Sequence, residues 1–169
     1  MITVLVPCDD SHNALLGIHH VMDEVRKGRE LRIHLVNVQP PFTRHVGQHF
    51  SYEVLASFHR EQADEALAAA RQLLDAEGLP YTVHAKVGDK AVCIAEMAMQ
   101  LECDLIVIGT SRKGSLLRAL ENSLTTRLIE CSHVPVEVIA GTPPSTVERV
   151  GVPAGIGAGL ALLWMGAAT

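Results

Sequence analysis

The chain lacks paired cysteines, an excess of positive charge and a secretion signal. Its four cysteines, Cys8, Cys93, Cys103 and Cys131, form no CxxC pair, which argues against a redox motif, a zinc knuckle or a disulfide framework. We expect each to be a small buried apolar side chain. The net charge of −5 and the scattered basic residues predict no nucleic-acid partner. The first residues show no signal-peptide pattern, which predicts a cytoplasmic protein.

Patterns typical of catalysis are also missing. No serine lies in a GxSxG nucleophile elbow. His45 and His49 have a spacing that suits a metal only on a helix with a carboxylate nearby, and we expect a polar loop there instead. The sequence therefore predicts a protein that is not an enzyme.

The chain does contain an alternation of strand and helix patterns. Ser11 and Asp89 are expected helix N-caps, and Gly78 with Pro80 should end the longest helix. Apolar runs predict strands at residues 2–7, 31–41, 81–89, 104–109 and 134–140. Amphipathic runs predict helices after Ser11 and at 53–80, 89–103 and 123–133. This order predicts one α/β domain, a doubly wound, mostly parallel five-stranded sheet flanked by four helices.

Ligands of such sheets bind outside the carboxyl ends of the strands, where the strand order reverses. Asp9 follows the first expected strand and Gly109 ends the fourth. Hydroxyls, a cation and a second glycine follow at Thr110, Ser111, Lys113, Gly114 and Ser115. Asn122 and Ser123 begin the next helix, whose N-terminal amides suit an anion. A short loop of this kind can equally be a simple turn.

Three stretches together resemble the universal stress protein family over residues 1–140. They are "VLVPCDDS", "VGDKAVCIAEMA" and "DLIVIGTSRKGSLLRALENSLTTRLIECSHVPVEVI". In nucleotide-binding members, the loop after the fourth strand carries Gly, two residues, Gly, nine residues, and Gly followed by Ser or Thr. On this chain those positions hold Gly109, Arg112 and the pair Asn122 and Ser123. The resemblance implies that Asp9 contacts a nucleoside and that Val36 lines an adenine pocket.

Two of the three family glycines are therefore replaced. The Arg112 side chain either fills the space that a nucleotide needs or pairs with its phosphate. Asn122 is a milder change because Asn tolerates left-handed backbone. Two alternatives follow for this loop. It is a turn packed by its own side chains, or it is a site for ATP or AMP, with Mg²⁺ beside a triphosphate. Slow ATP hydrolysis at such a site would be incidental. The candidate binding residues are Asp9, Val36, Gly109, Arg112, Lys113, Gly114, Ser115, Asn122, Ser123 and Leu124.

The last expected strand would lie at a sheet edge, where an exposed apolar strand invites pairing. By resemblance this strand builds a homodimer, here through Val136, Glu137, Val138 and Ile139. The other possibility is that the C-terminal tail covers the edge.

The tail is the part of the chain that resembles the family least. Residues 141–149 form a polar linker, and Val150 to Thr169 contains no charged residue. A helix of 20 residues spans about 30 Å, the thickness of a bilayer core. Three alternatives follow for the tail: a membrane or membrane-protein contact, packing on the dimer, or disorder.

The function expected from these patterns is that of a homodimeric stress-response or regulatory binding module with a degraded nucleotide loop. The first alternative is an ATP or AMP sensor that uses the same loop. The second is a cytoplasmic regulatory subunit attached to a membrane protein through its tail.

Overall fold

A computed structural model describes residues 1–43, 45, 48–110 and 124–141. Within these residues, strands and helices alternate as expected, and each strand but the last is followed by a helix. In chain order the elements are β1 (Ile2–Pro7), α1 (His12–Arg26), β2 (Leu31–Gln39), α3 (Tyr52–Ala76), β3 (Tyr81–Val87), α4 (Lys90–Gln100), β4 (Leu105–Thr110), α6 (Leu124–Cys131) and β5 (Val136–Ala140).

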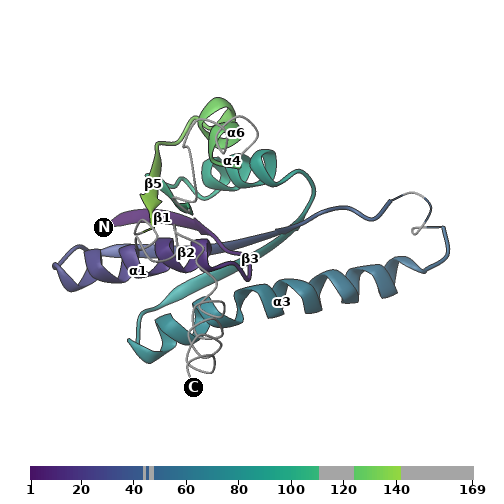
Figure 1. Cartoon of the computed structure of the whole chain (residues 1–169), viewed down its shortest axis with the longest axis horizontal. Helices are drawn as coiled ribbons and strands as arrows, with labels where there is room; N and C mark the ends of the chain where they lie inside the picture. Colours follow the sequence, from purple (N-terminus) through teal and green to yellow (C-terminus); the bar gives the residue numbers. More distant parts are fainter. Residues whose placement is uncertain (44, 46–47, 111–123, 142–169) are drawn as a thin grey trace, which may run out of the picture.

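The five strands form one sheet in the order β3-β2-β1-β4-β5, and every neighbouring pair is parallel (Figure 1). The chain builds outward from β1 through β2 to β3 and then returns to place β4 on the other side of β1. The strand order therefore reverses between β1 and β4, the point at which doubly wound sheets bind ligands. The expected fold class is confirmed.

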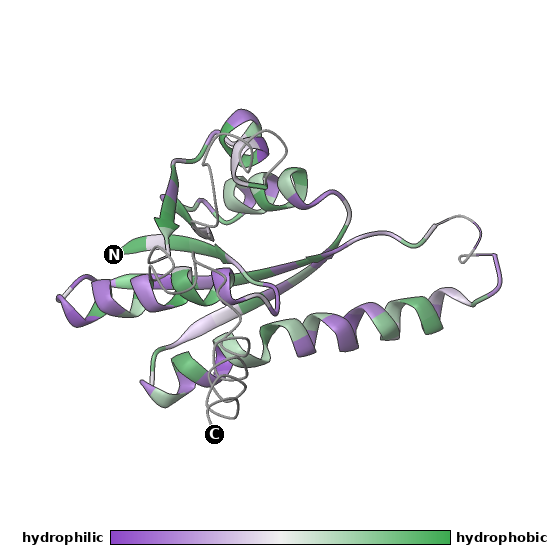
Figure 2. Ribbon diagram, viewed as in Figure 1, coloured by the Kyte–Doolittle hydropathy of each residue, from purple (hydrophilic) through white to green (hydrophobic). Residues whose placement is uncertain are grey.

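Helices cover both faces of the sheet. α1 and α3 lie on one face, and α4 and α6 lie on the other (Figure 1). The first core joins Val6 and Leu35 to Ile18 of α1 and Leu67 of α3. The second core packs other strand residues against Ile94 of α4 and Leu128 of α6. Because both faces are covered, the central strands are mostly hydrophobic (Figure 2).

The expected helix ends are confirmed. The Ser11 hydroxyl accepts a hydrogen bond from the Ala14 amide at 3.3 Å and caps α1. Asp89 Oδ1 accepts one from the Val92 amide at 3.2 Å and caps α4. Gly78 follows α3 with φ of +65°, a left-handed conformation that costs glycine little.

The first half of α3 projects beyond the sheet, next to the segment that leaves β2 (Figure 1). We call residues 40–43 and 48–60 the arm. The buried residues of α3 begin only at Ala63, whereas Tyr52, Val54 and Phe58 on the arm are exposed. The arm therefore adds surface to the molecule and little core.

Cys8 and Cys103 are buried, as expected. Cys93 is half-buried, and Cys131 is exposed, so the prediction was wrong for Cys131. The physical reason is its place in the last turn of α6, which packs through Thr125 and Leu128 nearer its start.

No helix in the described ranges is long and apolar enough to cross a membrane. The linker beyond Gly141 and the tail from Val150 to Thr169 lie outside the described residues.

Candidate functional site

A cavity of about 210 Å³ opens where β1, β2 and β4 end, between α1 and the first turn of α4. Four of the candidate residues, which come from four different elements or their ends, line it together: Asp9, Val36, Gly109 and Leu124. These four candidates from the sequence therefore lie around one pocket, at the point where the strand order reverses.

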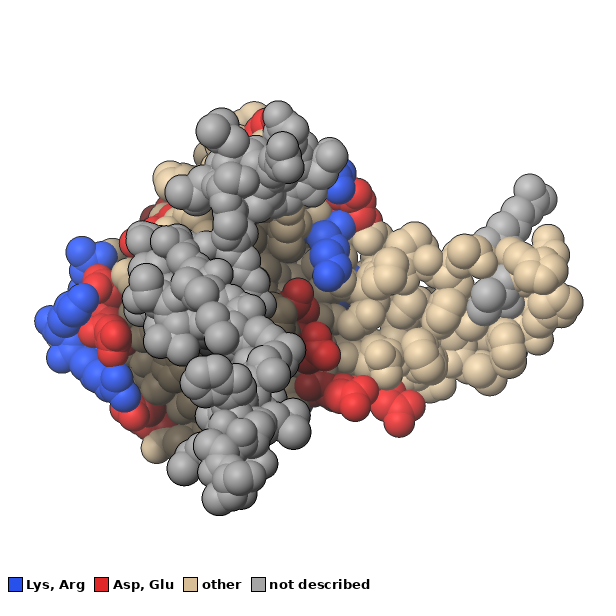
Figure 3. Space-filling view, viewed as in Figure 1, with Lys and Arg blue, Asp and Glu red and all other residues tan. Residues whose placement is uncertain are grey.

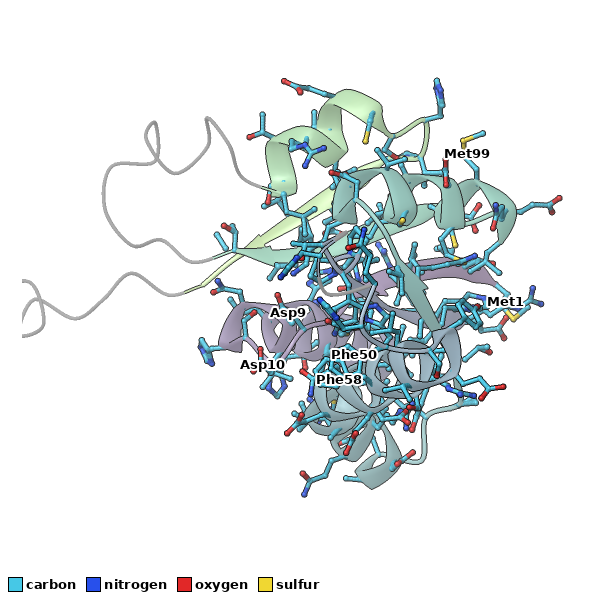
Figure 4. The ribbon with its side chains drawn as sticks, turned by 90° about the vertical axis from the view of Figure 1, so that its right-hand side faces the viewer. Met1, Asp9, Asp10, Phe50, Phe58 and Met99 are labelled. Carbon is cyan, nitrogen blue, oxygen red and sulfur yellow. The ribbon has the colours of Figure 1, made fainter. Side chains whose placement is uncertain are left out.

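Asp9 has its two carboxylate oxygens in different surroundings. Oδ1 accepts hydrogen bonds from the Ser11 amide, at 3.1 Å, and from the Ser11 hydroxyl. Oδ2 lies 4.0 Å from Nζ of Lys90, and both side chains line the pocket. The bonds from Ser11 fix the orientation of the carboxylate, so that Oδ2 can accept a hydrogen bond from a hydroxyl or amino group of a ligand. Figure 4 shows Asp9 and Asp10 among the side chains of this region.

The inner wall of the pocket is apolar. Val36, Val38, Ile94 and Ile108 line it and are at most 6% exposed. Such a wall suits a flat ring, while the neighbouring polar groups can fix the orientation of the ring.

Asn37 ties the loop after β1 to β2. Its amide nitrogen donates to the Cys8 carbonyl at 2.8 Å, and its amide oxygen accepts from Gln39 Nε2 at 2.8 Å. The Cys8 amide in turn donates to the Val36 carbonyl at 2.8 Å. Because the Asn37 side chain is only 2% exposed, these bonds are protected from water and hold Asp9 in place.

Cys8 precedes Asp9 and lines the same pocket, but its thiol is not activated. Burial, with a smaller contribution from the charge of Asp9, raises the pKa of Cys8 to about 12. The group is therefore protonated at neutral pH and lacks the thiolate that a nucleophile needs.

Gly109 is required by a contact that the sequence did not reveal. A Cβ atom at this position would lie 1.8 Å from the Asn13 carbonyl oxygen and 2.9 Å from its carbon. At this position the start of α1 approaches β4 closely. The glycine therefore sets how closely the start of α1 packs against the pocket.

The remaining candidates lie outside the described residues. These are Arg112, Lys113, Gly114, Ser115, Asn122 and Ser123. Whether Arg112 occupies the place of a nucleotide or meets its phosphate stays a prediction. α6, which begins at Leu124, contributes Leu124 and Thr125 to the pocket directly after this loop.

Lys90 and Asn37 were missed by the sequence analysis. Lys90 is the first residue of α4, directly after the N-cap Asp89. The sequence signal was that it follows the third expected strand, whose carboxyl end lies at the same sheet edge as that of the first. The signal for Asn37 was an amide between two valines, Val36 and Val38, in an expected strand. Next to Lys90, the Arg127 guanidinium lies 2.8 Å from Asp89 Oδ2. That bond and the Val92 amide hold the pKa of Asp89 below its ordinary value.

A second, polar recess of about 280 Å³ continues from the pocket toward α3. It shares Asp9, Asn37, Val38 and Lys90 with the pocket and adds four polar side chains, Asp10, Gln39, Gln62 and Glu65. Figure 3 shows acidic and basic side chains next to each other where the arm meets the rest of the domain.

Within the described part of the chain, no group of three His, Cys, Asp or Glu side chains could hold a metal ion.

Comparison with known proteins gives the same fold. The chain is 29% identical over 140 residues to the universal stress protein MJ0531 of Methanocaldococcus jannaschii, covering 80% of each chain. A solved universal stress protein family structure from Arabidopsis thaliana with AMP bound has a TM-score of 0.61 at 16% identity, covering 86% of this chain and 96% of that one. The universal stress protein of Archaeoglobus fulgidus in complex with dAMP has a TM-score of 0.58 at 20% identity, covering 82% and 98%.

The family model for universal stress proteins matches residues 1–140. That match spans all the described strands and helices, including the residues that line the pocket. The chain therefore belongs to the universal stress protein family.

Proposed function

We propose that the protein is a regulatory binding module that takes up an adenine nucleotide in the pocket at the ends of β1, β2 and β4, and that it acts as a homodimer. The observation that carries this proposal is the gathering of Asp9, Val36, Gly109 and Leu124 around one cavity. The described walls offer groups that suit ligand binding: apolar surface for a ring, the Asp9 carboxylate for hydroxyls, and the Lys90 cation nearby.

The pocket fits the base and sugar of a nucleotide. Val36 and Ile94 offer apolar surface to a purine ring. Asp9 Oδ2 is placed to accept a hydrogen bond from a ribose hydroxyl, because Oδ1 is already bonded to Ser11. Lys90 Nζ supplies a positive charge beside this carboxylate, with which a phosphate of the ligand can pair.

The solved relatives support the choice of ligand. Proteins of this fold are known with AMP and with dAMP bound. A nucleoside monophosphate requires fewer phosphate contacts than ATP, and the family glycines that approach the phosphates are replaced at Arg112 and Asn122 in this chain. We therefore expect AMP to bind at least as tightly as ATP.

Isothermal titration calorimetry with adenosine, AMP and ATP tests the proposal. Asp9→Ala should weaken AMP binding by about tenfold or more, since a hydrogen bond to a charged group contributes about 1.5–3 kcal/mol. Asp10→Ala is the matched control, because Asp10 lines the polar recess and not the pocket. Absence of binding by all three compounds would refute the proposal, and so would equal losses in the two variants.

A further inference from the structure

The arm holds most of the aromatic residues of an aromatic-poor chain. The sequence has three Phe, two Tyr and one Trp. All three Phe and Tyr52 lie on the arm, where Phe50, Tyr52 and Phe58 are 55%, 85% and 48% exposed. Figure 4 looks onto the arm from its free end and labels Phe50 and Phe58. Exposed aromatic side chains gathered on one projecting element are typical of an interaction surface.

A cavity of about 690 Å³ runs along this arm, and we call it the arm groove. It is lined by residues of three segments: Pro41, Phe42, Thr43, Tyr52, Leu55, Ala56, His59, Arg60, Ala85, Lys86 and Val87. Aromatic rings pack together in its wall: the centroid of the Phe42 ring lies 4.4 Å from that of His59 and 5.6 Å from that of Phe58. His59 Nδ1 is buried and has no hydrogen-bond partner among the described residues. This atom is an unsatisfied polar group in the wall of the groove.

The charges around the arm groove limit what can occupy it. Among the described residues that line it there is no Asp or Glu, and the two charged ones, Arg60 and Lys86, are both cations. A basic segment would be repelled, and a segment without charged side chains avoids the cost of taking charges out of water. Because most of the lining side chains are apolar and the charged ones are cations, the occupant should be apolar and free of Lys and Arg.

The chain itself contains such a segment. Residues 150–169 carry no charge and are rich in Ala, Leu and Gly, with one Trp at position 164. β5 and β3 are the two outer strands of a parallel sheet and end at the same edge. Four strand spacings of about 4.8 Å separate them, or about 19 Å. Residues 141–149 can extend over about 30 Å, which is enough to cross that edge.

We propose that residues 150–169 dock in the arm groove of the same chain. Docking removes the apolar tail and the exposed Tyr52 side chain from water together. This inference does not depend on nucleotide binding, because it involves a different cavity and different residues.

Trp164 is the only Trp of the chain and reports directly on the tail. In full-length protein without lipid, its fluorescence should be blue-shifted and weakly quenched by acrylamide. The double variant Tyr52→Asp/Ala56→Asp places two carboxylates one helical turn apart on the groove wall and should raise the quenching constant at least twofold. Met99→Asp is the matched control, because Met99 is 54% exposed on α4, away from the arm. Circular dichroism checks that each variant is folded.

Three results would overturn the proposal. In the first, Trp164 is fully quenched in the unmodified protein. In the second, it is shielded only when vesicles of phosphatidylcholine and phosphatidylglycerol are added, which would make lipid the occupant. In the third, the shielding disappears on hundredfold dilution, which would make a second copy the occupant.

A reciprocal experiment leaves the arm unaltered. Leu162→Asp/Leu163→Asp puts charge into the tail of the full chain, and hydrogen exchange is then followed in residues 52–60. Faster exchange there, with unchanged exchange in α4, is the expected result. Unchanged exchange in residues 52–60 would contradict docking even if the arm variant failed to fold.

Discussion

His34 Nδ1 on β2 lies 3.0 Å from His84 Nε2 on β3, a hydrogen-bonding distance between two imidazole rings. The His34 side chain is buried and the His84 side chain is half-buried. Burial lowers the pKa of both histidines. The charge of His84 and then that of Arg32 lower the pKa of His34 further, and Lys86 does the same for His84.

This pair predicts a loss of stability in mild acid. The unfolded chain takes up protons below the ordinary histidine pKa of about 6.5, while the folded protein keeps both rings neutral to lower pH. The stability from the neutral pair is therefore complete above about pH 6.5 and is lost as pH falls toward the lowered pKa values. Urea midpoints at about pH 7.5 and pH 5.5 measure the loss. His84→Gln should reduce this difference, whereas the exposed His19→Gln should not. An unchanged difference in His84→Gln would show that the pair is not responsible.

Gly109→Ala should destabilise the domain by about 3 kcal/mol or more, because its Cβ would overlap the Asn13 carbonyl of α1. The urea midpoint reports the loss, and nucleotide binding should weaken with it because α1 must shift away from the pocket. Gly141→Ala is the control. Its Cβ would meet the end of the flexible Leu16 side chain at 3.2 Å and the Thr110 carbonyl oxygen at an ordinary 3.6 Å, so the change should cost less than about 1 kcal/mol. Equal midpoints for the two variants would contradict the contact.

The proposed homodimer through β5 can be tested at Val138. β5 is an outer strand of the sheet, and Val138 is 39% exposed. The neighbouring Glu137 lies 3.3 Å from His20 of α1 and so contacts its own domain. Val138→Arg should convert a dimer into a monomer in sedimentation velocity, since two such charges would face each other. Ile129→Arg, at an exposed site on α6, should remain dimeric. A monomeric unmodified protein would exclude the dimer.

The cysteines should differ strongly in reactivity. Burial raises the pKa of Cys8 to about 12 and that of Cys103 to about 11, with smaller contributions from Asp9 and Asp104. Burial also raises the pKa of the half-buried Cys93. Iodoacetamide at about pH 8 should therefore modify the exposed Cys131 first, as followed by peptide mass spectrometry. Cys131→Ser should remove the fast phase, and early modification of Cys8 would show that the end of β1 opens.

Local signals predicted much of this fold. Ser11 and Asp89 were identifiable as N-caps because a short polar side chain directly precedes an apolar periodic run, and Gly78 because it follows one. The parallel order followed from the alternation of strands and helices. Asp9 and Val36 were placed at the site through the family resemblance and lie on one pocket.

Features that depend on distant parts of the chain were not predictable. Asn37 is positioned by the Cys8 carbonyl, which is 29 residues away, and Gly109 is required by the backbone at Asn13. Periodicity indicates which face of α3 is apolar but not where the sheet beneath it ends. For that reason the arm and its groove were not foreseen, although the helix itself was.

The course of β2 joins the two cavities. Val38 lines the pocket, and Pro41, three positions later on the same backbone, lines the arm groove. Between them, the Gln39 carbonyl accepts a hydrogen bond at 2.9 Å from Gly88, next to Val87 of the groove. One continuous backbone segment, residues 38–41, therefore contributes to the walls of both cavities. A substitution that alters the backbone at Gln39 would therefore disturb the pocket and the arm groove at the same time.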